Sequence, residues 1–174
     1  MEPSKPPSDS HVTDYVYKIF PNDLNSQGTA FGGTIISLLD RIALVIAERH
    51  SQKVCVTVSI DAVHFLAAAR KGDNLIIQGK INRSWTSSME IGLRVTAENA
   101  FTGELRHILS AYFTFVALDE NGKPTPVPAL LPITPDEKRR FEEADHRRSR
   151  RIRASKEQEE FRKTFEKKDA KEQS

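Results

Sequence analysis

The stretch PNDLNSQGTAFGGTIISLLDRIALVIAERH, residues 21–50, decides the fold because a polar loop in it leads directly into an apolar helix. Residues that favour turns, namely Pro, Asn, Asp, Ser and Gly, fill its first half as far as Gly28. From Gly33 to Glu48, apolar residues cover nearly the whole circumference of the predicted helix. A helix that is apolar all round is usually buried. We therefore expect the rest of the chain to pack around a buried central helix.

One acidic residue, Asp40, lies in the middle of this predicted helix, next to Arg41. A carboxylate inside a buried helix is costly unless it is paired, hydrogen-bonded or used in chemistry. Gly32 and Gly33 stand at the helix start, where free N–H groups and the helix dipole attract negative charge. These features are typical of a reaction site. The residues alone leave a second interpretation open, in which Asp40 is a structural acid that is paired with Arg41 or caps a neighbouring backbone group.

The segments on either side of the helix read as strands. Residues 12–20 predict a first strand before the loop, and residues 54–61 alternate strictly between apolar and polar after the helix. Three more strands are expected at residues 74–82, 84–98 and 105–118, with Gly79 marking a bulge or bend. A helix followed by strands with short links predicts an α+β domain, in which an antiparallel sheet packs against one helix.

Composition excludes several classes of protein. The single cysteine, Cys55, cannot form an internal disulfide and is too isolated for a zinc site. Residues 1–10 lack the apolar core of a secretory signal, and no apolar run is long enough to span a membrane. The first 134 residues are nearly neutral, which gives no support for nucleic-acid binding. We predict a cytoplasmic globular protein with no membrane or nucleic-acid partner and no metal.

Three parts are expected along the chain: a disordered N-terminus at 1–10, a folded domain at 11–133 and a charged helical extension at 134–174. The extension opens with Thr134-Pro135-Asp136-Glu137, a capping box with proline at the first helical position. Three interpretations of this helix stay open. It is a solvated helix held by i,i+4 charge pairs, a partner-binding helix that uses Phe161 and Phe165, or an RNA-binding segment centred on HRRSRRIR at 146–153.

Residues 20–40, FPNDLNSQGTAFGGTIISLLD, resemble the signature of the hotdog-fold acyl-CoA thioester hydrolases. Matches in order and spacing are Pro21, Asn25, Gly28, Phe31-Gly32-Gly33 and Asp40, followed by Val56-Thr57-Val58, His64-Phe65, Gly72-Asp73 and Trp85-Thr86-Ser87-Ser88-Met89. The resemblance covers residues 12–130 and implies a hotdog fold, an antiparallel sheet wrapped around a long central helix. The chain departs from the family at Phe65-Leu66-Ala67-Ala68-Ala69, where relatives often carry a basic or proline-containing turn.

The resemblance implies an enzyme that hydrolyses acyl-CoA to coenzyme A and a carboxylic acid. Coenzyme A is part of the substrate and a product, and no other cofactor is expected. Asp40 is implied as the general base or, alternatively, as a nucleophile, and Asn25 as the group that orients the water or the carbonyl. The further substrate-binding candidates are Phe31, Gly32, Gly33, His64, Arg83, Thr86, Ser87 and Ser88. Simple packing or surface roles are the alternative for the last five.

In the family, Asn25 of one subunit serves Asp40 of its partner, so the resemblance also implies a homo-oligomer. Hotdog domains pair their sheets edge to edge as dimers, and three such dimers often assemble. Two other functions stay open: a hotdog domain that binds acyl-CoA without hydrolysing it, as a sensor or assembly module, and a hydrolase of thioesters carried on acyl carrier protein.

Overall fold

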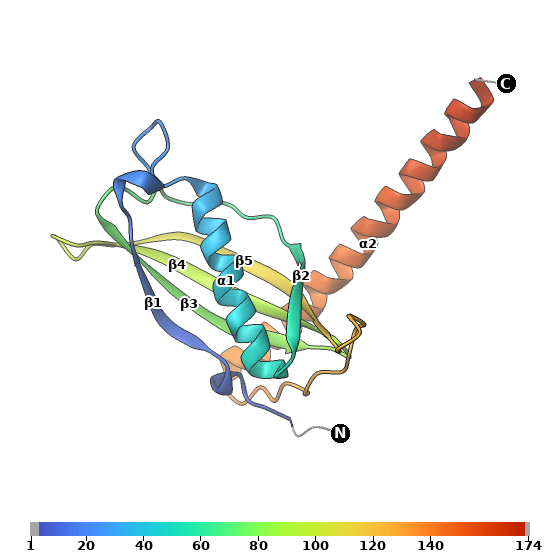
Figure 1. Cartoon of the computed structure of the whole chain (residues 1–174), viewed down its shortest axis with the longest axis horizontal. Helices are drawn as coiled ribbons and strands as arrows, with labels where there is room; N and C mark the ends of the chain where they lie inside the picture. Colours follow the sequence, from blue (N-terminus) through green and yellow to red (C-terminus); the bar gives the residue numbers. More distant parts are fainter. Residues whose placement is uncertain (1–3, 173–174) are drawn as a thin grey trace.

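The computed structural model describes the backbone of residues 4–172 and the side chains of residues 4–164. Along the chain the elements are η1 (Pro7–Asp9), β1 (Val12–Lys18), η2 (Pro21–Asp23), α1 (Gly32–Ser51), β2 (Val54–Ile60), β3 (Asp73–Ser84), β4 (Ser88–Asn99), β5 (Leu105–Leu118) and α2 (Pro135–Glu172). Every predicted strand and both predicted helices are present, and Figure 1 shows their arrangement. None of the described helices is long and apolar enough to span a membrane.

The five strands form one antiparallel sheet in the order β1-β3-β4-β5-β2. Helix α1 lies along one face of the sheet, and α2 begins behind the opposite face (Figure 1). The α+β class and the antiparallel sheet around a central helix are therefore confirmed. The prediction of short links between all later strands was wrong at one place. Strand β2 pairs with β5 rather than with β3, and residues 61–72 lead from one side of the sheet to the other.

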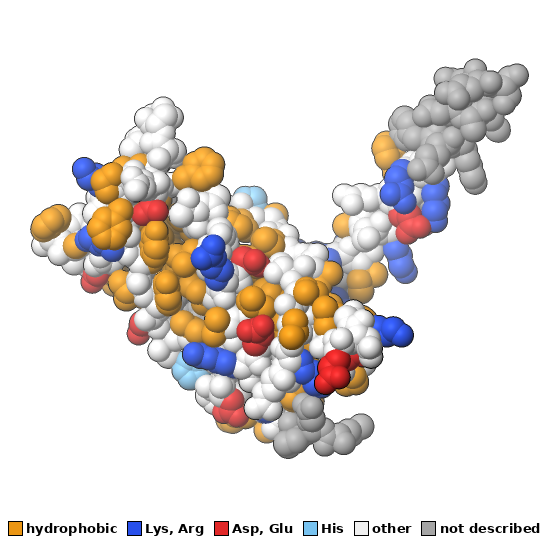
Figure 2. Space-filling model, viewed as in Figure 1, with side chains coloured by type: hydrophobic (Ala, Val, Ile, Leu, Met, Phe, Trp, Pro, Cys, Tyr) orange, Lys and Arg blue, Asp and Glu red, His pale blue; other side chains and the backbone are white. Residues whose placement is uncertain are grey.

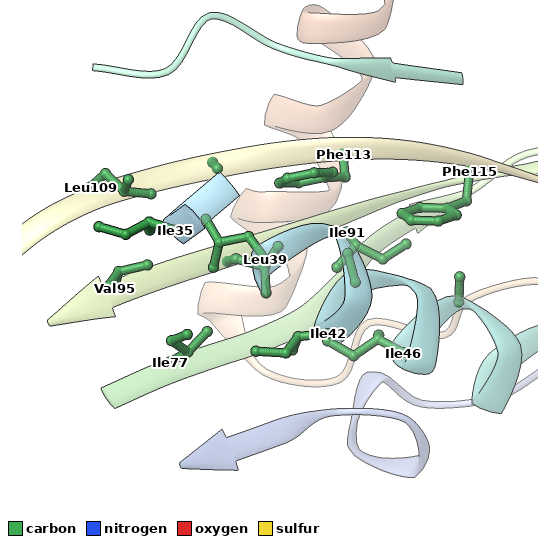
Figure 3. Packing of buried hydrophobic residues seen from close by; sticks show 14 of the residues in the cluster. Ile35, Leu39, Ile42, Ile46, Ile77, Ile91, Val95, Leu109, Phe113 and Phe115 are labelled. Atoms are coloured by element: carbon green, nitrogen blue, oxygen red, sulfur yellow. The ribbon is translucent and has the colours of Figure 1, made fainter. Parts of the chain in front are cut away.

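The core lies between α1 and the sheet. Residues one helical turn apart on α1 point at the sheet, where they meet large apolar side chains (Figure 3). The labelled members of this cluster are Ile35, Leu39, Ile42, Ile46, Ile77, Ile91, Val95, Leu109, Phe113 and Phe115. The other side of α1 is not covered, because Val45 is 41% exposed. Burial all round the helix, as its sequence predicts, therefore does not occur within a single chain.

Gly79 lies at an irregularity of the sheet, as predicted, and also serves close packing. The β3–β4 register is regular at Gly79, but the β1–β3 pairing shifts between Val12, which pairs with Gly79, and Tyr15. A Cβ at Gly79 would stand 2.7 Å from Ile46 Cδ1 and 2.9 Å from Leu93 Cδ2. The missing side chain thus allows α1 to approach the sheet closely.

Two further predictions differ from the structure. The strand expected from Ser84 begins at Ser88, because residues 85–87 form a tight turn closed by the Trp85 N–H and the Ser88 carbonyl at 2.8 Å. Within the N-terminus expected to be disordered, residues 4–10 lie against the body. The Lys5 N–H donates to the Ala129 carbonyl at 3.0 Å, and Pro7 is buried. The first three residues lie outside the described part.

Helix α2 begins as predicted. The Glu137 N–H donates to Thr134 Oγ1 at 3.2 Å, and Glu137 Oε2 accepts from the Thr134 N–H at 2.9 Å, which is a capping box. The first turns then pack against the body, since Ala144 is fully buried and Phe141 contacts the core. The prediction of a simply solvated helix therefore fails for this half of α2.

A buried ionic network fastens α2 to the sheet. Glu90 on β4 is fully buried, and its carboxylate accepts from Arg147 at 2.7 Å and from Arg151 at 3.1 Å. Arg151 also bonds Asp61 at 2.8 Å, and the Arg147 guanidinium lies 3.7 Å from the centre of the Tyr112 ring. Two arginines of the predicted RNA-binding segment are thus used to hold the fold, which argues against that interpretation.

We expect Arg147→Met to lower the free energy of unfolding by about 3 kcal/mol, because it removes one partner of a buried carboxylate. Urea unfolding at a fixed protomer concentration measures the loss. Arg139→Met is the matched control, since Arg139 makes i,i+4 and i,i+3 ion pairs on the exposed side of the same helix. The control should leave the midpoint unchanged. Equal midpoints for both variants would contradict a structural role for the network.

Candidate active site

The loop before α1 is held in place from three directions. The Tyr17 hydroxyl donates to Asp23 Oδ1 at 2.9 Å, and this bond raises the pKa of Tyr17. The Phe31 N–H donates to the Asp23 carbonyl at 2.7 Å, and the Ala30 N–H donates to the Ala69 carbonyl at 2.8 Å. The loop is therefore tied to the end of β1, to the helix start and to the connection that follows β2.

Asn25 lies at the tip of this loop, where its side chain organises the turn. Its Oδ1 accepts from the N–H groups of Gln27 and Thr29 at 2.9 and 3.2 Å, and its Nδ2 donates to Thr29 Oγ1 at 3.0 Å. Gly28 completes the turn with a φ of 73°, which favours glycine. The side chain that the sequence predicts for the site is thus rigid, half-buried and engaged with its own loop.

The start of α1 presents free backbone donors. Its N-cap residue, Phe31, makes no side-chain cap, and its carbonyl accepts from the N–H groups of Thr34 and Ile35. Within the described part of the chain, the N–H groups of Gly32 and Gly33 have no acceptor. A Cβ at Gly33 would lie 2.8 Å from the Phe31 ring, and one at Gly32 would lie 3.2 Å from the Phe65 ring. Two aromatic rings therefore lie directly against these glycines, at a helix N-terminus whose free N–H groups suit a negatively charged oxygen.

Asp40 stands eight residues further along α1 and faces β2. Its Oδ1 accepts a hydrogen bond from Thr57 Oγ1 at 2.7 Å. Among the described ion pairs none joins Asp40 to Arg41, which is exposed. The structural alternative of a paired acid is thus not what the structure contains. A half-buried carboxylate with one neutral donor keeps acceptor capacity for a water molecule.

Asn25 and Asp40 do not meet within one chain. No hydrogen bond between the described atoms joins them, and Asn25 is used by its own loop at the start of α1. At a rise of about 1.5 Å per residue, Asp40 lies roughly 12 Å along the helix from Gly32. The two predicted catalytic residues are therefore separate parts of this surface.

Strand β2 borders the site and exposes an apolar row. Val54, Val56, Val58 and Ile60 are all exposed, whereas Cys55 is buried. Figure 2 shows further hydrophobic side chains on the face of the molecule that carries α1. The pairing with β5 shifts between Thr57 and Ser59, so a β-bulge lies directly after the residue that bonds Asp40. Bulges of this kind aim side chains near functional sites.

The other predicted site residues fall in two places. His64 and Ser88 are exposed or half-buried and line a groove of about 1310 Å³ between β2, β5 and α2. Arg83 instead holds α2: it donates to the Phe141 carbonyl at 3.2 Å and lies 4.0 Å from the centre of that ring. The structure therefore gives Arg83 a packing role and does not bring it to Asp40.

Thr86 and Ser87 belong to the tight turn between β3 and β4. The Thr86 carbonyl accepts from the Val127 N–H at 3.0 Å, and the Ser87 carbonyl accepts from the Ala117 N–H at 2.9 Å. These backbone bonds join the turn to the end of β5 and to the segment after it, far along the sheet from the helix start. Within the described residues, no group of three or more His, Cys, Asp and Glu side chains could hold a metal ion.

Thr57 is the site residue that sequence reasoning missed. It matched the family pattern within Val56-Thr57-Val58 but received no role. The available signal was the polar side of an alternating strand next to a helix with a single acid. The alternation alone does not say which side of the strand meets the helix, and the structure turns Thr57 to Asp40 of α1.

Comparison with known sequences places the chain among thioester hydrolases. The family model of the thioesterase superfamily matches residues 27–100. A protein of Bacillus subtilis named as an uncharacterized acyl-CoA thioester hydrolase is 41% identical over 120 residues, which covers 69% of this chain and 70% of the relative. The human cytosolic acyl coenzyme A thioester hydrolase is 37% identical over 134 residues, 76% of this chain but 35% of the relative. This chain spans about a third of that protein.

Solved structures of acyl-CoA thioesterases have the same fold as this chain. A hexameric acyl-CoA thioesterase superimposes with a TM-score of 0.84 at 38% identity, covering 88% of this chain and 98% of that one. The acyl-CoA hydrolase of Staphylococcus aureus, solved with butyryl coenzyme A and coenzyme A, gives 0.79 at 34% identity, covering 88% and 96%.

Alanine variants of the Staphylococcus aureus enzyme have also been solved, each replacing one asparagine, one aspartate or one threonine. Those three positions are 15 and 17 residues apart, the same spacing that separates Asn25, Asp40 and Thr57 in this chain.

Proposed function

The chain belongs to the thioesterase superfamily as an acyl-CoA thioester hydrolase, and on that premise we propose that Asp40 activates the water that attacks the thioester. The observation that carries the proposal is the hydrogen bond from Thr57 Oγ1 to Asp40 Oδ1 at 2.7 Å. It orients the carboxylate and leaves its second oxygen available. The identical spacing of the three substituted residues in the Staphylococcus aureus enzyme supports the same assignment.

The proposed reaction combines the Asp40 carboxylate with the backbone N–H groups of Gly32 and Gly33. Asp40 takes a proton from water, the resulting hydroxide bonds to the carbonyl carbon, and the carbonyl oxygen becomes negatively charged. Because Gly32 and Gly33 lie far from Asp40 of their own chain, the N–H groups that stabilise that oxyanion would be those of Gly32 and Gly33 of the partner subunit, together with the dipole of its α1. Collapse of the intermediate breaks the carbon–sulfur bond, and Asp40 returns its proton to the thiolate of coenzyme A, which leaves the carboxylic acid and the free carboxylate of Asp40. Attack by Asp40 itself, through the oxygen that Thr57 leaves free, is the alternative to general base catalysis.

A second subunit completes the proposed site. Asn25 lies apart from Asp40 in its own chain, and the rigid turn around Asn25 suits a group that reaches a neighbouring subunit as one unit. The exposed valines of β2 and its free edge are the place where a second sheet would pair. We infer a dimer joined through β2, and the hexameric relatives support assembly of three such dimers.

Further parts of the proposal rest on the relatives. Coenzyme A enters with the substrate, and the steps above need no other cofactor. The mammalian relatives are named cytosolic, and we propose a cytoplasmic location for this protein as well. Phe31, Gly32 and Gly33 would hold the thioester, and His64 and Ser88 would line the approach to it.

Asp40→Asn should lower thioester turnover by about 10²- to 10⁴-fold, because the amide cannot accept a proton from water. Release of free thiol from acyl-CoAs of short to long chain length measures this effect. Arg41→Gln, a change at the neighbouring exposed position, is the control and should keep turnover near that of the wild type. A folded Asp40→Asn variant with full turnover would exclude Asp40 as the base. Coenzyme A binding without turnover by the wild type would favour a binding module.

Mixing two inactive chains tests whether the site is shared. If Asn25 serves Asp40 of the partner, a dimer of one Asn25→Ala chain and one Asp40→Asn chain contains one intact site. Random mixing after unfolding and refolding should therefore restore about a quarter of the wild-type activity. Each variant refolded alone is the control. If the mixture stays as inactive as its components, the two residues act within the same chain.

Thr57→Val should lower kcat by about tenfold with little change in stability, because it removes the bond that orients Asp40 but keeps the shape of the side chain. Thr57→Ser keeps the hydroxyl and should retain most of the activity. Steady-state kinetics with both variants decides between a hydrogen-bonding role and simple packing. Equal losses in the two variants would speak for packing.

A further inference from the structure

Helix α2 extends well past the edge of its own sheet. It crosses behind β4 and β5, where Arg147 and Arg151 bond Glu90, and meets the end of β2 through Asp61. Beyond Arg151 the helix continues to Glu172 and stands clear of the body (Figure 1). The ionic network fixes its direction at the point where it leaves the sheet.

A groove opens between this part of α2 and the sheet. It measures about 1310 Å³, and both its walls carry apolar side chains: Val58 and Ile60 come from β2, Val116 from β5, and Ile152 from α2. Ile152 is 46% exposed although it points into the groove from the middle of the chain's most charged helix. Figure 2 shows the hollow between the body and the projecting helix.

The start of β2 exposes apolar side chains on the same face of the sheet. Val56 pairs with Val116, which lines the groove, and Val54 pairs with Leu118. Paired residues share a face, so Val54 and Val56 point away from α1. Val54 is 65% exposed in the single chain. Nothing within the described residues covers it.

A two-fold pairing of β2 strands brings these features together. In an antiparallel pair, the end of one β2 lies beside the start of the other. Each α2 leaves its sheet at the end of its own β2, next to Asp61. Continuing past the edge, it therefore runs over the start of the partner's β2, on the face where Val54 and Val56 are exposed.

We propose that α2 is an intersubunit arm whose segment 152–164 packs across the partner's sheet, with Ile152 against Val54 and Val56 of the partner subunit. The proposal rests on the β2-paired dimer described under Proposed function. The proposal adds a second contact between the two subunits. Without the arm, the seven residues of β2 would supply most of the dimer interface. The occupant is a second copy, since the groove is continuous with the edge at which that copy pairs.

Short-range cross-linking tests the arm. The double variant Ile152→Cys, Val54→Cys is treated with a short bis-maleimide and run on a denaturing gel. Reciprocal contacts in a two-fold dimer should link most of the protein as dimers and stop there. A link within one chain is not expected, because the seven residues of β2 separate the two positions by roughly 20 Å. Burial raises the pKa of the Cys55 thiol and keeps it unreactive.

Wild-type protein with Cys55 alone and the pair Phe101→Cys, Val54→Cys are the controls, Phe101 being 93% exposed in the β4–β5 turn. Both should stay unlinked. A ladder of trimers and larger species would place α2 on a chain other than the β2 partner and overturn the proposal. Unlinked monomers would overturn it as well. Native mass and thiol release from the same double variant before cross-linking show whether it is a dimer and an active hydrolase, which separates failure of the arm from failure of the proposed function.

Discussion

The free edge of β2 is the constraint on which the rest of the molecule depends. One side of this strand pairs with β5, while the other carries unpaired backbone groups beside exposed valines. Such an edge favours pairing with another strand. Thr57 lies on the same strand and holds Asp40, so the element that invites a partner also positions the proposed base. The seven residues of β2 therefore belong both to the proposed dimer interface and to the proposed active site.

The two faces of the sheet are stabilised by different physics. On one face, α1 buries apolar side chains against the strands, and Gly79 allows close contact. On the other, a buried glutamate and two arginines one helical turn apart hold α2. A buried ion pair gives less net stability than apolar packing, but it has strict geometric demands. A network of this kind suits a helix whose direction matters more than the strength of its attachment.

Periodicity and turn chemistry made most of the fold predictable. The strands, the capping box at Thr134 and the loop-to-helix entry were each specified by local residue patterns. Features that depend on contacts between distant parts of the chain were harder to predict from the sequence. The pairing of β2 with β5, the bulge after Thr57 and the use of Arg147 by Glu90 depend on residues distant in sequence. For the same reason Asp40 could be identified as an unusual acid from its own helix, while the role of Thr57 depends on a contact between that helix and β2.

The hydrogen bonds that hold the Asn25 side chain in its own turn explain why the proposed site needs a second chain. Its amide and carbonyl oxygen are both engaged by its own turn, which holds the side chain in one conformation at some distance from Asp40. A group fixed in this way contributes orientation without an entropic cost at the moment of reaction. It can do so only where a neighbour supplies the carboxylate. A second sheet paired along the edge of β2 would also exclude water around Asp40 and strengthen the electrostatic interactions there. Assembly would then complete the set of reacting groups and the environment they require in a single step.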